Sequence, residues 1–494
     1  MVISTSASAC QVREQSGPEE GVRPLSGIKK EPSSHPRLAQ RVSEYWYEEA
    51  EQRLWPNSDE LEMEGLLGAI NFPDRQVLVE EWTNEARQFE AEFGEIEMKI
   101  HRFPASLRGL GRRYIVPMAV AIGMYHHSSR NLQEMEKVKR VAAHHFIKDS
   151  GHTFDEMYAA VFSIIGTSRG FYDTKLDVGD VESADVMFID GCFLLQYMLM
   201  CTGRAKLPPS LLSCFESNQA CISNDIMLLE NQLPWLVIET LRRFRSVHVE
   251  EFIGKMGRTL QIRGGMDRGP VVLDGGYTPP HLLGILWFYK TGSRNSGATL
   301  SDPDGFRSMS KIISAIELEE IGIKLTAGKT TKFMDMGIKK GFLSCDIFLA
   351  PLLLDDIRSC WLVNMAAFEV SVGMATSAGH GTYQIKAVVC SYLAVLAMLM
   401  DREEDVHELR SKRLVQGELT NKETLDFFKM LVKRISGGPL YIHIMKEVEA
   451  YKLNRWIWIK VHHFVYKNFK AIFTVFSIIG VLVGIFKTLL SLKK

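Results

Sequence analysis

Hydrophobic residues recur three and four positions apart over much of the chain, which is the spacing of amphipathic helices. The pattern predicts helices over residues 44–55, 75–100, 131–150, 155–166, 187–203, 225–244, 359–370, 385–400, 403–415 and 422–435. Three of these runs, 155–166, 187–203 and 225–244, are the more apolar ones. We expect these three to form core helices.

Two segments depart from the helical pattern. Residues 263–310 are rich in turn-forming residues around one apolar island at 281–290, which predicts a loop-rich insert. Residues 321–351 alternate in polarity and break at Gly328 and Gly341, which predicts short strands. The expected fold class is mainly α (α+β), a large helical body with a small antiparallel sheet.

The two ends of the chain differ from this body. Residues 1–40 are rich in Ser, Pro, Glu and Arg, and this composition predicts a disordered arm. Residues 471–492 are apolar except for Lys487 near one end, and about 20 apolar residues suffice for a helix to cross a bilayer. The expected organisation is therefore an arm, a helical domain over 41–450, a basic and aromatic juxtamembrane segment over 451–470, and a transmembrane helix over 471–492.

The flanks of the apolar span predict its orientation. The first residues have neither the basic leader nor the apolar core of a secretory signal. More basic residues precede the span, at positions 452, 455, 460, 467 and 470, than follow it, at 487, 493 and 494. Because basic flanks favour the cytoplasmic side, we expect a single-pass protein of the plasma membrane or endomembranes, with its body in the cytosol.

Composition narrows the possible partners. The 58 basic and 59 acidic residues give a net charge of −1, which argues against a nucleic-acid partner, because such binding depends on neutralising phosphates. The eight cysteines form no C-x-x-C pair, and several lie in apolar runs typical of buried thiols. A reducing compartment fits this pattern, and a disulfide in an extracellular domain stays open.

Gly166-Thr167-Ser168-Arg169-Gly170 matches the G-x-S-x-G nucleophile elbow of α/β-hydrolases. That motif requires a strand before the serine and a helix after it. Acidic residues follow the motif, and no alternation of strands and helices surrounds it. A tail-anchored serine hydrolase using Ser168 is therefore the alternative function, and a glycine-capped helix end is the structural interpretation.

Other candidate motifs are incomplete. Gly328-Lys329-Thr330 ends like a phosphate-binding loop, but Ile323 occupies the position of its first glycine, so we expect a turn. The histidine pairs at 126–127, 144–145 and 462–463 lack the i, i+4 spacing of a zinc site. The pair at 462–463 lies near Trp456 and Trp458 and fits a membrane-interface belt. We predict no metal, no cofactor and no catalytic residue.

Glu230, Asn231 and Gln232 are three consecutive polar residues within an apolar run that ends at Pro234. Buried polar groups need hydrogen-bond partners. We expect a polar network where Pro234 kinks the helix, with backbone groups released at the proline as partners. A general base at Glu230 is the alternative, although no nucleophile or second carboxylate is evident beside it.

Several blocks stand out along the chain in order: HRFPASLRGLGRRYIVPMAVAIGMYHHSSRNLQEMEKVKR, FIDGCFLL, DIMLLENQLPWLVIETL, AIELEEIGIKL, VNMAAFEV, EEDVHELR and the apolar tail. The first resembles the opening signature of the plant domain-of-unknown-function family 247, the others continue the resemblance, and it covers about residues 45–490. It implies a plant-specific, mostly helical protein with a C-terminal membrane segment. No enzymatic activity or catalytic set is established for the family, and some grass members are associated with self-incompatibility.

The expected function follows from the anchor and from this resemblance. We expect a non-enzymatic plant protein, tethered to a membrane through residues 471–492, that contacts an unidentified protein partner in cell recognition or signalling. A structural membrane adaptor is a further alternative. The sequence leaves the partner and the oligomeric state open.

Overall fold

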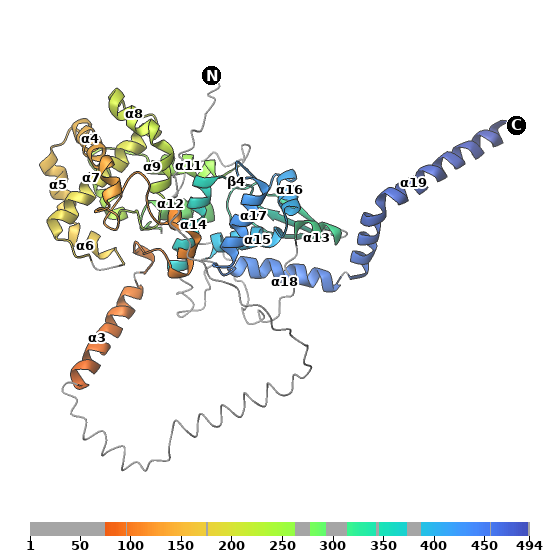
Figure 1. The fold of residues 1–494 in the computed structure, drawn as a ribbon, viewed down its shortest axis with the longest axis horizontal. Coiled ribbons are helices and arrows are strands. Elements are labelled where there is room, and N and C mark those ends of the chain that lie inside the picture. Colours follow the sequence, from red (N-terminus) through yellow and green to blue (C-terminus); the bar gives the residue numbers. More distant parts are fainter. Residues whose placement is uncertain are drawn as a thin grey trace, which may run out of the picture. The chain divides into compact units, whose positions relative to one another are not determined.

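A computed structural model of the protein describes residues 75–94, 96–173, 176–261, 277–292, 314–341, 345–372, 387–454 and 456–492 (Figure 1). The arm predicted over 1–40, the helix predicted over 44–55 and most of the insert lie outside the described residues. The chain divides into two compact units, Met1–Arg87 and Gln88–Lys494.

Helix α3 (Arg75–Gly94) confirms the amphipathic helix predicted from residue 75, although it ends at Gly94. Val79, Trp82 and Phe89 of this helix are exposed. Short 3-10 turns follow at Ile96–Met98, Ala105–Leu110, Arg112–Tyr114 and Arg130–Leu132. Between the last two turns the chain has no regular structure, yet residues 120–124 are buried.

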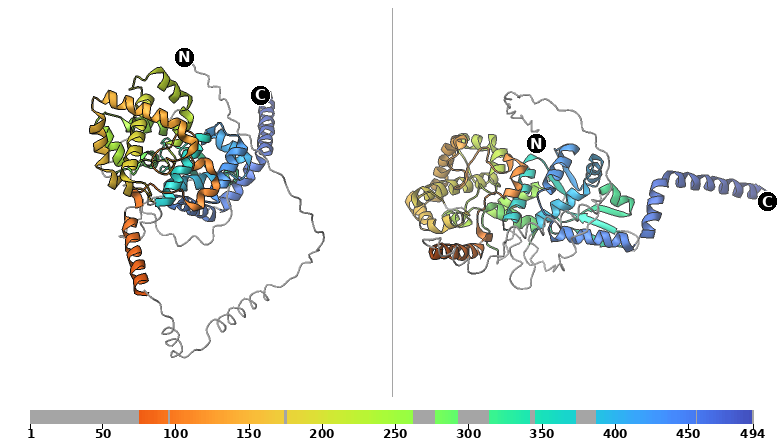
Figure 2. Two further views of the ribbon diagram at one scale, coloured as in Figure 1. Left: turned by 60° about the vertical axis from the view of Figure 1, so that its left-hand side comes forward. Right: turned by 60° about the horizontal axis from the view of Figure 1, so that its bottom comes forward.

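Three of the four helices that follow pack against the fourth, which is apolar. They are α4 (Gln133–Ser150), α5 (Phe154–Phe162), α6 (Ile165–Gly170) and α7 (Asp180–Cys201). Helix α7 is mostly buried, and α4, α5 and α6 pack against it. Figure 2 shows these orange and yellow segments together in both views. The prediction of a core helix at 187–203 is confirmed by α7. At 155–166 the helix is confirmed, with a break after α5 at Phe162, but its place in the core is not, because only Met157 and Val161 of α5 are buried.

The prediction of one helix over 225–244 is wrong. The next helices are α8 (Pro209–Ser217), α9 (Gln219–Asp225), α10 (Trp235–Arg242), α11 (Val249–Thr259) and α12 (Leu282–Thr291). Helix α9 ends at Asp225, and α10 begins after Pro234, so the polar block lies in a turn between two helices. Helix α12 is the apolar island of the predicted insert.

A small sheet follows α13 (Ala315–Glu320). Strands β1 (Ile323–Ala327), β2 (Gly337–Lys340) and β3 (Cys345–Leu349) pair in the order β1-β3-β2. β2 pairs with β3 antiparallel, as predicted, but β1 pairs with β3 in parallel. The difference arises because β2 lies beyond β3 instead of pairing with β1 as a hairpin.

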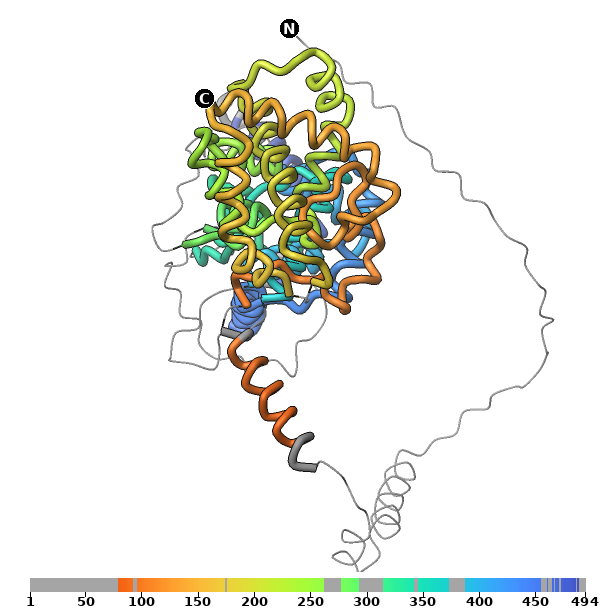
Figure 3. Tube along the Cα trace, turned by 90° about the vertical axis from the view of Figure 1, so that its left-hand side faces the viewer, coloured from red at the N-terminus to blue at the C-terminus, as the bar shows by residue number. Residues whose placement is uncertain are grey.

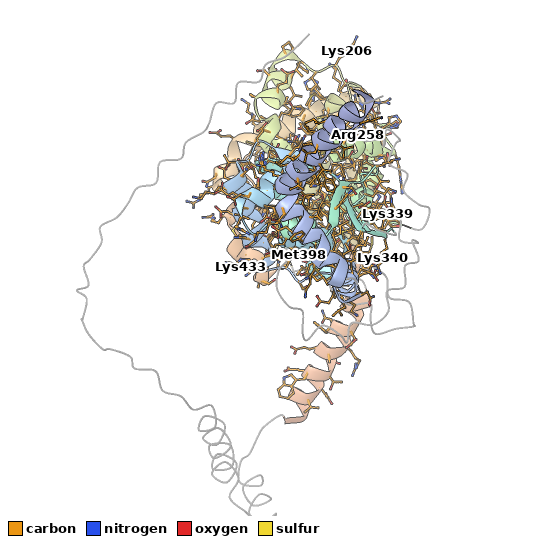
Figure 4. The ribbon with its side chains drawn as sticks, turned by 90° about the vertical axis from the view of Figure 1, so that its right-hand side faces the viewer. Lys206, Arg258, Lys339, Lys340, Met398 and Lys433 are labelled. Atoms are coloured by element: carbon orange, nitrogen blue, oxygen red, sulfur yellow. The ribbon has the colours of Figure 1, made fainter. Side chains whose placement is uncertain are left out.

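A second pair joins β4 (Leu352–Leu354) to β5 (Val415–Gly417), also in parallel. Lys339 and Lys340 of β2 are exposed and are labelled in Figure 4. The prediction of a small sheet is thus confirmed, while its purely antiparallel pairing is not.

The remaining helices are α14 (Asp356–Val372), α15 (Val388–Leu399), α16 (Glu403–Ser411), α17 (Asn421–Val432), α18 (Pro439–Asn454) and α19 (Trp456–Leu492). Helix α14 contacts α9, α12 and α15, so it links helices that precede the sheet to one that follows it. Helix α19 confirms the predicted apolar C-terminal helix. Its stretch Lys467–Ile485 is long and apolar enough to cross a membrane, and the protein buries none of it. Asp180–Cys201 of α7 passes the same length and composition test but is a core helix.

Candidate functional site

A carboxylate at the end of α9 organises the irregular segment before Ile122. The Asp225 carboxylate accepts hydrogen bonds from the backbone N–H groups of Met118, Ala119 and Val120, at 2.6–3.0 Å. Backbone groups outside regular structure need such partners when they are buried. The Asp225 carboxylate therefore provides the hydrogen bonds that a neighbouring β-strand would otherwise provide to this backbone.

Asn231 continues this arrangement. Its Oδ1 accepts from the N–H of Ile122 at 2.7 Å, and its Nδ2 donates to the carbonyls of Val120 at 3.0 Å and Asp225 at 2.9 Å. The side chain is fully buried. Both ends of the amide are thus satisfied within the core.

Gln232 closes the turn between α9 and α10. Its Nε2 donates to the carbonyls of Ile226 and Leu228 at 2.8 Å, and its Oε1 accepts from the N–H of Leu283 in α12 at 3.1 Å. The predicted buried polar network is confirmed. The prediction of its hydrogen-bond partners is wrong, however, because the partners lie on remote segments and in the preceding turn, and not at Pro234.

Glu230 lies nearer the surface. Its carboxylate accepts from the N–H of Phe103 at 2.7 Å and from Nη1 of Arg102 at 3.1 Å. Nε2 of His126 lies 3.7 Å from Oε2 of Glu230. Burial lowers the pKa of His126, and the Glu230 carboxylate opposes that effect. These donors give Glu230 a positioning role for the chain around residue 103.

A buried ion pair joins α4 to α7. Nζ of Lys139 lies 2.5 Å from Oδ1 of Asp190 and 2.6 Å from Oε1 of Glu136. Burial alone would lower the pKa of Lys139, but these two carboxylates outweigh it and raise that pKa. The other oxygen of Asp190 accepts from the N–H of Gly123 at 2.8 Å. The pair thus fixes α4 on α7 and holds the irregular segment to both.

Gly123 is required at this point. Its φ of 73° is in the left-handed region, and an added Cβ would lie 2.2 Å from the carbonyl oxygen of Gln232. Only glycine fits such a conformation and approach without strain.

Ser168 is not presented as an elbow nucleophile would be. The motif Gly166–Gly170 lies within α6, which follows α5, so the strand–turn–helix arrangement is not formed there. The serine is fully buried, and its Oγ has no hydrogen-bond partner among the described residues. The helical interpretation of this motif is confirmed, although Phe171 and not a glycine occupies the C-cap.

The other sequence motifs do not converge. Gly328 follows β1 in a turn, where its N–H donates to the carbonyl of Leu349, and Lys329 and Thr330 are exposed. Within the described ranges, no three His, Cys, Asp or Glu side chains form a group that could hold a metal ion. The cysteines of those ranges form no disulfide. The side chains of the histidine pair at 462–463 do not belong to the described part of the structure.

A groove on the surface of α4, α5 and α7 is the best candidate for a site. It has a volume of about 390 Å³. Its floor is formed by apolar side chains, Ala143, Ile147, Phe154, Phe188 and Ile189, and its rim by Arg140, His144 and Lys148. Figure 3 faces this side of the molecule and shows the orange and yellow tubes of these helices adjacent to one another.

An aromatic ridge continues from the groove along α5. Phe154 is 52% exposed and Phe162 is 42% exposed. The ring of Tyr158 stacks between them, with centroid distances of 5.3 Å and 6.3 Å. The capping box of Thr153 and Glu156 starts α5 immediately before Phe154. The ridge therefore stands on a well-defined helix.

The Lys139–Asp190 ion pair and the groove lie on different faces of α4 and α7. Lys139 and Asp190 point into the core, while their neighbours Arg140 and Ile189 line the groove. Adjacent helical residues point in different directions, so the ion pair sets the spacing of the groove walls.

The sequence prediction missed the groove residues. A signal was present, because Arg140, His144 and Lys148 are four apart, as are Phe154, Tyr158 and Phe162. This spacing places each set on one face of a helix. Which faces meet depends on the packing of α4 and α5 on α7.

Two comparisons with known proteins relate this chain to plant proteins. A sequence model for the family DUF247, described as a plant protein of unknown function, matches residues 100–483. UPF0481 protein At3g47200 of Arabidopsis thaliana is 24% identical over 427 residues, which cover 79% of this chain and 84% of that protein. No solved structure matches. Because the family model covers most of the chain, the protein belongs to the DUF247 family of plant proteins.

Proposed function

We propose that the protein is anchored to a membrane by α19 and acts through protein–protein contacts at the groove of α4, α5 and α7. The observation that carries this proposal is the exposed aromatic ridge beside a basic rim. Single exposed apolar side chains are ordinary, but a contiguous exposed patch marks an interaction surface. Aromatic residues and arginine are also the types enriched in protein interfaces.

The proposed anchor is the apolar stretch Lys467–Ile485. Phe473, Phe476 and Val481 are each more than half exposed there, and burial in lipid would remove this surface from water. We propose a single-pass arrangement with the body in the cytosol, because more basic residues flank the span on the side of the body than on the other side. Protease protection of tagged protein in sealed membranes tests this topology.

Cell recognition or signalling is the proposed process. Support comes from the resemblance of the chain to a family in which some grass members are associated with self-incompatibility. A contact surface on a membrane-tethered body also suits such a role, because tethering raises the local concentration of the partners.

A non-enzymatic role is part of the proposal. We expect a fluorophosphonate probe to leave the protein unlabelled, because Ser168 is buried within α6. Labelling that is lost in the Ser168→Ala variant would favour the hydrolase alternative instead.

Photo-crosslinking from native membranes tests the contact surface. Benzoylphenylalanine replaces Phe154 in the full chain, and in a control it replaces Lys433, which is exposed beyond α17 and is labelled in Figure 4. We expect a discrete protein adduct from position 154 and none of that size from position 433. Equal adducts from both positions, or none from either, would contradict a contact at the groove.

A further inference from the structure

We infer that the groove receives an acidic amphipathic helix of a partner protein, with a bulky apolar side chain on its floor and carboxylates on Arg140 and Lys148. The inference rests on the proposed function and adds the chemistry of the partner. Three features of the groove support it: its charge, its floor and its walls.

The charge of the rim has one sign. Arg140, His144 and Lys148 line the groove, and no acidic side chain does so among the described residues. None of the ion pairs found within those residues involves Arg140 or Lys148, whereas Lys139 on the buried side of α4 has two carboxylates. Two exposed cations that form no ion pair in the described part of the chain favour an acidic partner.

The spacing of these cations fits a helix. Arg140 and Lys148 are two steps of four residues apart, and each step advances about 6 Å along α4. A helix that lies along α4 can place carboxylates at the same interval, with one apolar face between them. The complementary pattern is therefore glutamates seven or eight residues apart that flank an aromatic or leucine residue.

The floor of the groove accepts an apolar side chain. Its volume of about 390 Å³ is near the lower end of the range for ligand sites, roughly 300–1,000 Å³. Phe154 belongs to this floor and is half exposed, so a partner side chain placed against it buries apolar surface on both molecules. Such a side chain would be the anchor of the contact.

The walls favour a helical partner over an extended one. All the lining residues belong to α4, α5 or α7, and no strand edge of the described residues lines the groove. An extended peptide gains most of its affinity by pairing with a strand edge, whereas an amphipathic helix binds a groove between helices through its side chains.

A suitable probe exists within the chain itself. A synthetic peptide of residues 75–94 has five glutamates and two arginines, and places Val79, Trp82 and Phe89 on one stripe. We would measure its binding by fluorescence anisotropy to the full-length protein in nonionic detergent. Two control peptides replace either all five glutamates by glutamine or both Trp82 and Phe89 by alanine.

Charge reversal locates the binding. The groove variant is Arg140→Glu/Lys148→Glu, and the matched control is Lys422→Glu/Lys433→Glu, two exposed lysines at the ends of α17. Both variants lower the net charge by the same amount, so a difference between them reports the place and not the total charge. Phe154→Ala tests the floor separately, and thermal melting verifies that all variants remain folded.

We expect the acidic peptide to bind wild type and the control variant alike, and the groove variant and Phe154→Ala at least about tenfold more weakly. Both control peptides should bind weakly, and added salt should weaken the acidic peptide further. No binding of the acidic peptide, or equal binding to wild type and groove variant, would overturn the inference. A position-154 adduct in the crosslinking experiment would then leave the proposed function standing with a partner of different chemistry.

Discussion

At the scale of single residues, the core depends on polar side chains that replace missing secondary structure. Asp225 and Asn231 together bind four of the five backbone N–H groups from Met118 to Ile122, and the carbonyl of Val120. A loop normally lies at the surface because buried backbone groups cost free energy when unpaired. Here buried carboxylate and amide groups remove that cost, so such a segment can cross the core.

Asn231→Leu should lower the stability of the body. The change strands the N–H of Ile122 and the carbonyl of Val120 in the core, at about 1–3 kcal/mol for each group left unsatisfied, while the carbonyl of Asp225 still accepts from the N–H of Leu228. Thermal melting should therefore shift down by far more than for Gln133→Leu, an exposed control on α4. Unchanged melting together with lost partner binding would show that the block serves recognition instead.

His281 should make the protein sensitive to acid. It is fully buried at the N-cap of α12, where its Nδ1 accepts from the N–H of Gly284 at 3.2 Å. Burial lowers the pKa of His281 to about 3, against about 6.5 in an unfolded chain. The neutral ring is therefore favoured in the folded state. Its contribution to stability is complete above pH 6.5 and is lost as the pH falls toward 3.

The measurable size of this effect is about 2 kcal/mol between pH 7 and pH 5, because each pKa unit corresponds to about 1.4 kcal/mol. His281→Asn keeps a side-chain acceptor at the N-cap but does not titrate. Melting curves from pH 7 to pH 5 should fall less steeply for this variant than for wild type. Parallel curves would show that other groups cause the acid sensitivity.

At the scale of elements, local pattern predicted most helices but not their interruptions. Helices α4, α5 and α7 follow directly from apolar residues three and four apart. The run at 225–244 has the same pattern, yet Asn231 bonds to backbone 109 and 111 residues away. Such long-range bonds override a local preference, and no periodicity within the run reports them.

The sheet and the groove illustrate the same limit. The strands were predictable from alternation, but the position of β2 beyond β3 is set by tertiary packing. The groove residues Arg140 and Phe154 lie on helices that were predicted, and only the packing on α7 brings them together. The apolar and basic helix faces can therefore be predicted from the sequence, but which of these faces meet to form a site depends on tertiary packing.

Helix α5 offers a test at this scale. Thr153→Ala removes half of the capping box and should cost about 1 kcal/mol of stability, since the N–H of Glu156 loses its side-chain partner. Phe154 is the first residue of α5, so the affinity for the acidic peptide should fall as well. Thr153→Ser keeps the cap and should preserve both properties. Equal loss in both variants would contradict this account of the helix start.

At the scale of the whole molecule, the account joins a helical body to an apolar tail. The two candidate spans differ in burial, because 78% of the most apolar 18-residue stretch of Asp180–Cys201 is buried in the body and none of the corresponding stretch of Lys467–Ile485 is. A buried apolar helix contributes to the core, whereas an exposed one needs another apolar phase. This contrast, more than hydropathy alone, identifies α19 as the proposed anchor.

Deleting residues 471–494 should release the body from membranes. The described part of the chain has no other exposed span of comparable length, so the truncated protein should remain in the supernatant after a carbonate wash. Replacing 471–485 by an unrelated apolar sequence of equal length should restore pelleting. Persistent sedimentation of the truncated protein would show a second membrane attachment.

Vesicle flotation tests the central claim, a tethered body that binds partners at the groove, most directly. Full-length protein is reconstituted into neutral phosphatidylcholine vesicles, the labelled peptide of residues 75–94 is added, and the vesicles are floated through a density gradient. We predict that protein and peptide float together, and that Arg140→Glu/Lys148→Glu floats without the peptide while Lys422→Glu/Lys433→Glu floats with it. Failure of the protein to float, or equal flotation of the peptide with both variants, would contradict the account.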